Sequence, residues 1–204
     1  MFNWIKLPML SLAAFFMFCA IAKAIPREKR LLVATMPFVY KANEPAYAGI
    51  ESGLCDAMSA ELVKTEKFRM IERSRIDALM TELKLQDTGL IDPQTPLKVG
   101  KQLGAQAVIV GSIVNVSVRD EWRSVKFAEK TTRFAEIEAE ARLILVETGE
   151  LLGSGRAVGK AKSAEKHAFG GKLGELAGKE AVVQKALTGL SKKLAKNLTK
   201  TYKP

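Results

Sequence analysis

Two groups of residues in this chain have the types that nucleophilic or phosphate chemistry uses. Cys55 and His167, the one histidine of the chain, could form a pair in which the imidazole activates the thiol. The segment Gly153–Lys160 (GSGRAVGK) combines glycines with a lysine, as loops that bind phosphate do. Its spacing fits neither GxxxxGK followed by Ser or Thr nor GxGxxG. A buried cysteine, a surface histidine and the glycines of a β-hairpin are the simpler interpretation.

Alternating carboxylates are the third candidate for chemistry. Glu136, Glu138 and Glu140 could be read as an acid–base or metal site. Such alternation is more typical of the solvated face of a strand, and no loop of oxygen ligands surrounds these residues. No Cys/His cluster has the spacing of zinc ligands. We therefore expect a protein that is not an enzyme and that has no catalytic, cofactor-binding or metal-binding residues.

The N-terminal segment predicts export. A positively charged start is followed by an almost continuously apolar run, Leu7–Ala22, and small residues stand at Ala22 and Ala24, the positions that a signal peptidase reads. We expect residues 1–24 to be a secretory signal peptide and residues 25–204 to form one α/β domain. Lipidation at Cys19 is an alternative, although bulky residues precede it, and an uncleaved anchor is another.

The charge of the chain favours anionic partners. It carries 32 Lys and Arg and 22 Asp and Glu, a net charge of +10, and removal of residues 1–24 with their two lysines would leave +8. An exported protein does not usually meet nucleic acid, so we expect an anionic glycan or a membrane surface to be attracted by the C-terminal lysines, among them Lys192, Lys193 and Lys196. A solubilising helix face is the simpler alternative.

The apolar pattern predicts the elements that position these residues. Helices are expected at 49–67, from Ser74 as N-cap, from Asp92 to near Gly104, and at 180–199; strands are expected at 31–38, 68–72, 105–118, 134–146 and 151–161. A charged connector, Arg119–Thr132, separates two of the strands. Helix–strand alternation followed by a meander predicts an α/β fold: a single three-layer domain with a central mixed β-sheet of about five strands, flanked by helices, and a C-terminal amphipathic helix.

Four short motifs occur in an order that resembles a known family. They are Val33–Phe38 (VATMPF), Glu72–Ser74 (ERS), Gly100–Ala105 (GKQLGA) and Thr148–Glu150 (TGE). Over residues 31–160 the chain resembles the CsgG-type curli assembly and transport family, which includes CsgG/HfaB-like proteins. The resemblance implies an exported, periplasmic protein, with peripheral attachment to the outer membrane as an alternative. It further implies an accessory or scaffold subunit, acting in a homo-oligomeric ring with envelope secretion proteins, that assembles or transports a curli-like fibre or exopolysaccharide.

Two departures from the family argue against a channel. Channel-forming members carry a lipobox cysteine and two long β-hairpins. Here the first candidate region, Val114–Ala141, is charged in its middle, and residues 161–180 lack apolar alternation. A secretion-channel subunit is therefore the alternative to a scaffold, and entry of Val114–Ala141 into a membrane stays open. The residues expected to contact partners or other copies are Glu72, Arg73, Asp87, Arg119, Glu121, Trp122, Lys192, Lys193 and Lys196.

Mass spectrometry of the exported protein tests the expected cleavage. Because Ala22 and Ala24 fit the peptidase pocket, the mature chain should begin at Ile25. A diacylglyceryl group on Cys19 would contradict this prediction and would make the protein a lipoprotein.

Overall fold

The computed structural model describes residues 25–84, 94–168 and 171–202. Short helical turns cover Arg27–Lys29 and Pro45–Tyr47. The α-helices of this part of the chain are α1 (Ile50–Val63), α2 (Arg73–Glu82), α3 (Thr95–Gln102) and α4 (Lys179–Thr201). Its strands are β1 (Leu31–Thr35), β2 (Val39–Tyr40), β3 (Phe68–Met70), β4 (Ala107–Val125), β5 (Ala128–Leu145), β6 (Leu151–Ala168) and β7 (Gly171–Leu173).

One mixed sheet contains all of these strands. Its order is β3-β1-β4-β5-β6-β7, and the short β2 pairs with β4 beyond the end of β1. β1 runs parallel to β3 and to β4, whereas β4, β5, β6 and β7 are antiparallel neighbours. The α/β class, the mixed sheet and the C-terminal helix are thus as expected. The described sheet has seven strands, more than the five expected, because β2 and β7 are too short to give a periodic pattern.

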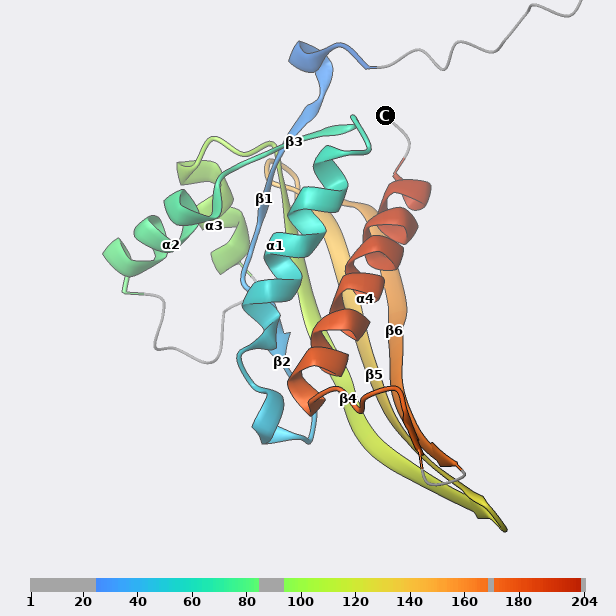
Figure 1. Ribbon diagram of the computed structural model, residues 1–204. Coiled ribbons are helices and arrows are strands. Elements are labelled where there is room, and N and C mark those ends of the chain that lie inside the picture. The colour runs from blue at the N-terminus through green and yellow to red at the C-terminus, as the bar shows by residue number, and fades with distance from the viewer. Residues whose placement is uncertain (1–24, 85–93, 169–170, 203–204) are drawn as a thin grey trace, which may run out of the picture.

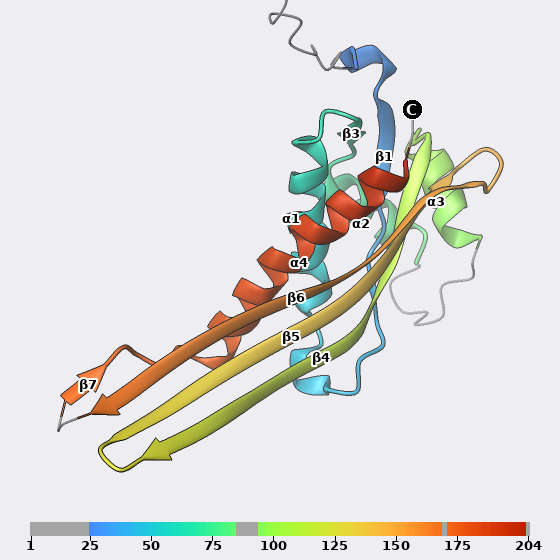
Figure 2. The same ribbon diagram turned by 90° about the vertical axis from the view of Figure 1, so that its right-hand side faces the viewer.

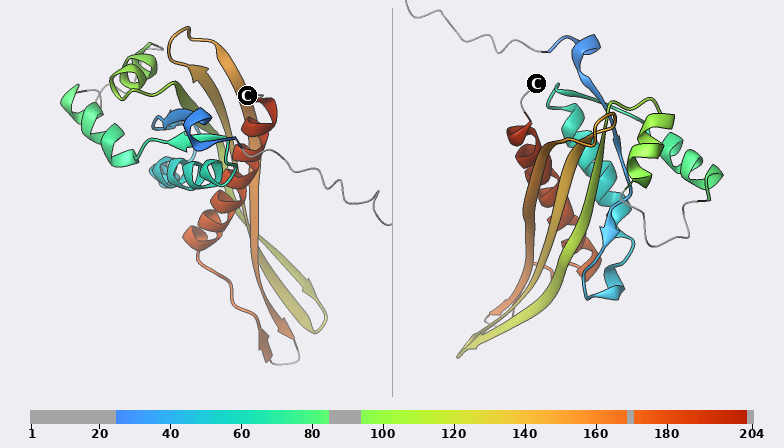
Figure 3. Two further views of the ribbon diagram at one scale, coloured as in Figure 1. Left: turned by 90° about the horizontal axis from the view of Figure 1, so that it is seen from above. Right: turned by 180° about the vertical axis from the view of Figure 1, so that it is seen from behind.

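Helices cover the two faces of the sheet unequally. α1 and α4 pack on one face, and α2 and α3 pack on the other, against β1 and the start of β4 (Figure 1). Alternation along the central strand explains this division, because Ile109 joins the core beneath α1 and α4 while Val108 joins the core beneath α2 and α3. Both side chains are fully buried, and Val110, expected to be buried, is only partly so. Seen from behind, the face opposite α4 carries none of the described helices beyond the start of β4 and the end of β5 (Figure 3).

The prediction that Arg119–Thr132 is a charged connector between two strands is wrong. β4 continues to Val125 and β5 begins at Ala128, so that only two residues form the turn. The strands persist because charged side chains pair across them: Arg133 makes two hydrogen bonds of 2.7 Å to the Asp120 carboxylate. With β6 they form an arm that projects beyond the helices (Figure 2). β6 also runs on to Ala168 and is followed by β7, so residues 161–180 are not merely a loop.

The expected start of the second helix is also wrong. Glu72 rather than Ser74 is the N-cap residue, and no side chain caps the helix there. Arg73 is already helical, because Asp77 one turn later and Asp56 of α1 hold its guanidinium. The expected helix start at Asp92 lies outside the described residues, and the observed α3 begins at Thr95.

Small residues on β6 allow α4 to lie directly on the sheet. Val183, Leu187, Leu190, Leu194 and Leu198 are all buried, as their spacing predicted. Beneath them, every second residue of β6 from Gly153 to Ala161 is glycine or alanine. A Cβ atom at Gly159 would lie 2.2 Å from the carbonyl oxygen of Ala186 and 2.6 Å from the Cβ of Leu190. The glycines of this segment therefore belong to a strand of the β5–β6 hairpin, as expected, and they lie beneath a helix.

The substitution Gly159→Ala tests this close approach. The methyl group would overlap the α4 backbone and force the helix off the sheet, so the free energy of unfolding should fall by about 2 kcal/mol. The control is Gly53→Ala in α1, where an added Cβ meets nothing within 4 Å. It should leave the protein as stable or raise its stability by up to about 1 kcal/mol. Urea unfolding measures both values, and equal stability of the two variants would contradict the proposed packing.

Candidate interaction surfaces

The corner between β3 and α2 is held by Arg73. Its guanidinium lies 3.4 Å from the Asp56 carboxylate on α1 and 3.2 Å from the Asp77 carboxylate on α2, and it donates to the Ser52 carbonyl oxygen at 3.2 Å. Arg73 therefore ties α1 to α2 within one subunit. The structure brings Glu72 to the same corner, where it is exposed and makes no ion pair with any described residue.

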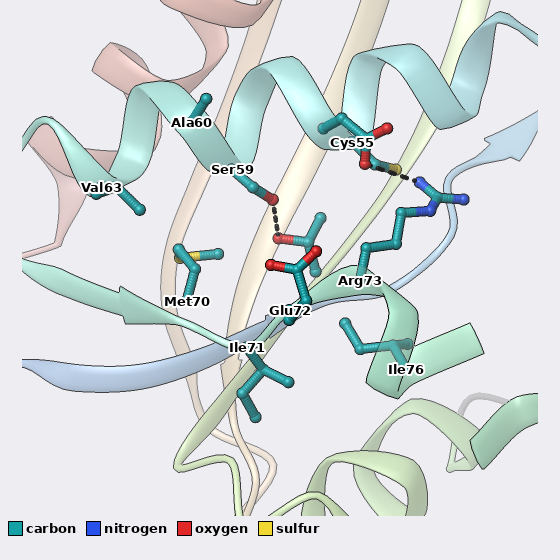
Figure 4. Close-up of a pocket in the computed structure, with 11 residues that line it drawn as sticks. Cys55, Ser59, Ala60, Val63, Met70, Ile71, Glu72, Arg73 and Ile76 are labelled. Carbon is teal, nitrogen blue, oxygen red and sulfur yellow. Dashed lines mark hydrogen bonds and ion pairs between the residues drawn. The ribbon is translucent and has the colours of Figure 1, made fainter. Parts of the chain in front are cut away.

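A pocket of about 350 Å³ lies beside this corner. Ser59 reaches into it from α1, and Glu72 reaches into it from the β3–α2 corner (Figure 4). Ile71 and Ile76 supply apolar wall, and the Ser59 hydroxyl bonds to that of Thr35 at 3.0 Å. The pocket can accept a small apolar group of a partner while its rim offers a carboxylate.

Cys55 lines the same pocket but is not placed for nucleophilic chemistry with His167. Its thiol is buried and faces the carbonyl oxygen of Met36 at 3.6 Å, and burial raises the pKa of the Cys55 thiol to about 11. His167 lies far along β6, opposite Glu129 near the hairpin turn, with its imidazole 3.7 Å from Glu165. The structure therefore does not bring the thiol and the imidazole together.

The alternating glutamates lie on the sheet face opposite α4. Glu136 pairs with Lys160 at 3.0 Å and Glu138 with Arg156 at 2.8 Å, while Glu140 accepts a hydrogen bond from Ser112. Across residues 25–84, 94–168 and 171–202, no three His, Cys, Asp or Glu side chains gather as metal ligands. Within the same ranges, no helix combines the length and apolar character that crossing a membrane requires.

The end of the arm exposes large apolar side chains. Trp122 is 64% exposed, Val125 72% and Phe127 73%. Arg119 and Glu121, which were expected to be contact residues in a connector, lie on β4 instead. The Arg119 guanidinium lies over the Phe134 ring and also contacts Glu121 at 3.4 Å. Asp87, also expected to be a contact residue, lies outside the described residues.

The C-terminal lysines contribute to a basic hollow of about 770 Å³ along the outer edge of β6, beside α4. Lys193 and Lys196 line it, whereas Lys192 does not. Lys200 lines it as well, and sequence reasoning missed the two cations that β6 contributes, Arg156 and Lys160. Basic residues recur at every second or fourth position of β6, and this spacing was the available signal that they share one strand face.

Comparison with solved structures relates the fold to known proteins. The lipoprotein GNA1162 from Neisseria meningitidis is 15% identical; the similarity covers 65% of this chain and 84% of that one, with a TM-score of 0.52. The LpoB C-terminal domain from Salmonella enterica is 17% identical, covering 63% of this chain and 81% of that one, with a TM-score of 0.44. The PelC dodecamer from Paraburkholderia phytofirmans is 12% identical, covering 89% and 93%, with a TM-score of 0.43. The similarity to GNA1162 shows that this chain and that lipoprotein share a fold.

Comparison with the sequences of curated proteins gives no match. A family model, in contrast, matches residues 17–201, nearly the whole chain; its description is "Curli production assembly/transport component CsgG". This match extends beyond the segment that carries the four motifs, and it confirms the resemblance seen in them. The chain belongs to the CsgG family.

Proposed function

We propose that this protein is an exported, non-enzymatic scaffold or accessory subunit of the cell envelope. It works in the periplasm, in the assembly or transport of an extracellular or envelope polymer such as a curli-like fibre or an exopolysaccharide. Membership of the CsgG family supports this role. The candidate surfaces support it as well, because they offer contact areas and charged groups rather than an activated nucleophile.

The observation that carries the proposal is the exposed end of the arm. Trp122 and Val125, on opposite faces of β4, and Phe127, in the turn, each expose apolar surface near the end of the arm, where the helices do not reach (Figure 2). Exposed apolar groups rimmed by charges mark contact sites between proteins. Glu121 and Arg123 supply such charges beside them.

The partner that we propose for the arm is a second copy of this chain. Beyond Ile113 no described strand pairs with the outer edge of β4, and β7 pairs with the outer edge of β6 only at Lys166–Ala168. The outer edge of β4 is therefore open along the arm, whereas β7 and the segment after it, where Ser163 bonds to Glu175 and Ala177, partly cover the outer edge of β6. An open strand edge can take part in a head-to-tail contact between copies, and repeated head-to-tail contacts close into rings. Burial of the arm end would add apolar contact to this association.

A secretion-channel subunit is the second candidate, and the arm itself favours it. The β4–β5 hairpin is paired without interruption from Asn115 to its turn, so the strands that the sequence seemed to lack are present. Against this candidate, Arg119 and Arg123 alternate with Asp120 and Trp122 along β4, so neither face is continuously apolar. An Arg or Lys facing lipid at mid-membrane depth costs about 2–4 kcal/mol. We therefore prefer the scaffold.

Light scattering on the mature protein tests the proposed self-association. The double variant Trp122→Ser, Phe127→Ser should dissociate the oligomer, because it removes apolar contact from the arm end. Leu151→Ser is the matched control, since Leu151 is a 55% exposed apolar residue at the opposite end of β6. It should leave the mass unchanged. A wild-type protein that stays monomeric at all concentrations, with no self-crosslink in cells, would refute the ring.

A planar-bilayer experiment separates the scaffold from the channel. The mature protein, expressed without residues 1–24, should stay in solution without detergent and should not raise the conductance of the bilayer. Reproducible channels from the purified protein, or release from cell membranes by detergent alone, would favour the channel subunit instead.

A further inference from the structure

The basic hollow along the outer edge of β6, beside α4, has the character of a binding site for a polyanion. We propose that it binds a carboxylated polysaccharide in extended form. This inference rests on the proposed function and deepens it, because it names the chemical class of the polymer. The hollow is lined by Glu138, Arg156, Ala157, Val158, Lys160, Lys193, Lys196, Asn197 and Lys200.

Cations outnumber carboxylates in the hollow by five to one. Arg156 and Lys160 come from one face of β6, whereas Lys193, Lys196 and Lys200 recur at three- and four-residue intervals on one face of α4. Glu138 partly neutralises Arg156, and the neighbouring Glu136 partly neutralises Lys160. For the ammonium groups of Lys196 and Lys200 the described part of the chain provides no ion pair or hydrogen bond. The hollow therefore keeps a positive charge that attracts an anion.

Side chains of α4 already occupy the backbone acceptors at this edge of β6. The carbonyl oxygens of Ser154, Arg156 and Val158 point away from β5 and accept hydrogen bonds of 2.9 to 3.1 Å. The donors are the Thr201 hydroxyl, the Asn197 amide and the Lys193 ammonium group, each one helical turn from the next.

Mainly hydrogen-bond donors remain available in the hollow. In a strand the N–H and the C=O of one residue point to the same side, so the N–H groups of Arg156 and Val158 face outward with their carbonyls. The ammonium groups of Lys196 and Lys200 are donors only. A ligand that supplies negatively charged acceptors therefore complements this surface.

This donor surface favours a glycan over a peptide. An acidic peptide that added a strand to β6 would need free carbonyl acceptors on that edge as well as N–H donors. The carbonyls of Ser154, Arg156 and Val158 are occupied, whereas a uronic acid polymer offers carboxylate and hydroxyl oxygens without needing them. The volume of about 770 Å³ leaves room for several sugar residues.

Fluorescence anisotropy with a labelled hexamer of galacturonic acid tests the proposal on the mature protein at low salt. Lys196→Ala, Lys200→Ala should weaken binding at least tenfold. The matched control, Lys185→Ala, Lys192→Ala, removes two exposed lysines of the same helix outside the hollow and should change affinity less than twofold. Lys196→Arg, Lys200→Arg should retain binding. Thermal melting verifies that each variant is folded.

The following outcomes would contradict the proposed glycan site. No binding of the hexamer at low salt, or equal losses in the two alanine pairs, would show that the hollow is not a specific anion site. Tighter binding of a poly-glutamate peptide than of the hexamer would assign the hollow to an acidic protein. The hollow variant should still self-associate in light scattering, and the arm variant should still bind the hexamer, so that failure of this inference is distinct from failure of the proposed ring.

Discussion

The close approach of α4 to β6 is the constraint on which most of this structure depends. A Cβ atom at Gly159 would overlap the α4 backbone, and Gly155 lies 3.1 to 3.4 Å from that helix by the same measure. Because β6 offers glycine and alanine here, α4 can bury its leucines against the meander. The same approach brings Lys193, Asn197 and Thr201 within reach of the outer carbonyls of β6. Because α4 can approach β6 so closely, the helix covers the sheet and positions the lysines of the hollow. Its side chains also occupy the outer edge of β6, which keeps other strands from pairing there.

The body of the fold could be predicted from the sequence because burial leaves a periodic pattern there. Ile109 and its neighbours form an apolar run between two layers of helices, and Val183 to Leu198 form one helical stripe. The arm could not be predicted in this way. Its strands face solvent on both sides, so charged residues such as Asp120 and Arg133 are compatible with a strand as long as they pair across it. That pairing depends on register, which the local sequence does not reveal.

The candidate surfaces were predictable to the extent that they belong to a single element. Lys193 and Lys196 share a helix face, and Arg73 stands at a strand–helix corner, so each could be named from spacing alone. Their partners come from other elements. Asp56 reaches Arg73 only because the start of α2 lies beside α1, and Arg156 joins the lysines only because α4 lies on β6. The expected cap at Ser74 failed for a related reason, since the ion pairs of Arg73 with Asp56 of α1 and with Asp77 start the helix two residues earlier.

The arm end and the basic hollow occupy different parts of one strand, which allows assembly and binding to act separately. Val158 lines the hollow, whereas Ala168 lies beside the hairpin turn. The ten residue steps from Val158 to Ala168, extended at about 3.3 Å each, separate the two surfaces by about 30 Å. A ring held by its arms would therefore leave the hollow of every subunit open. An extended polyanion could then contact several subunits in turn, and weak binding at each hollow would add up through the repeated sites.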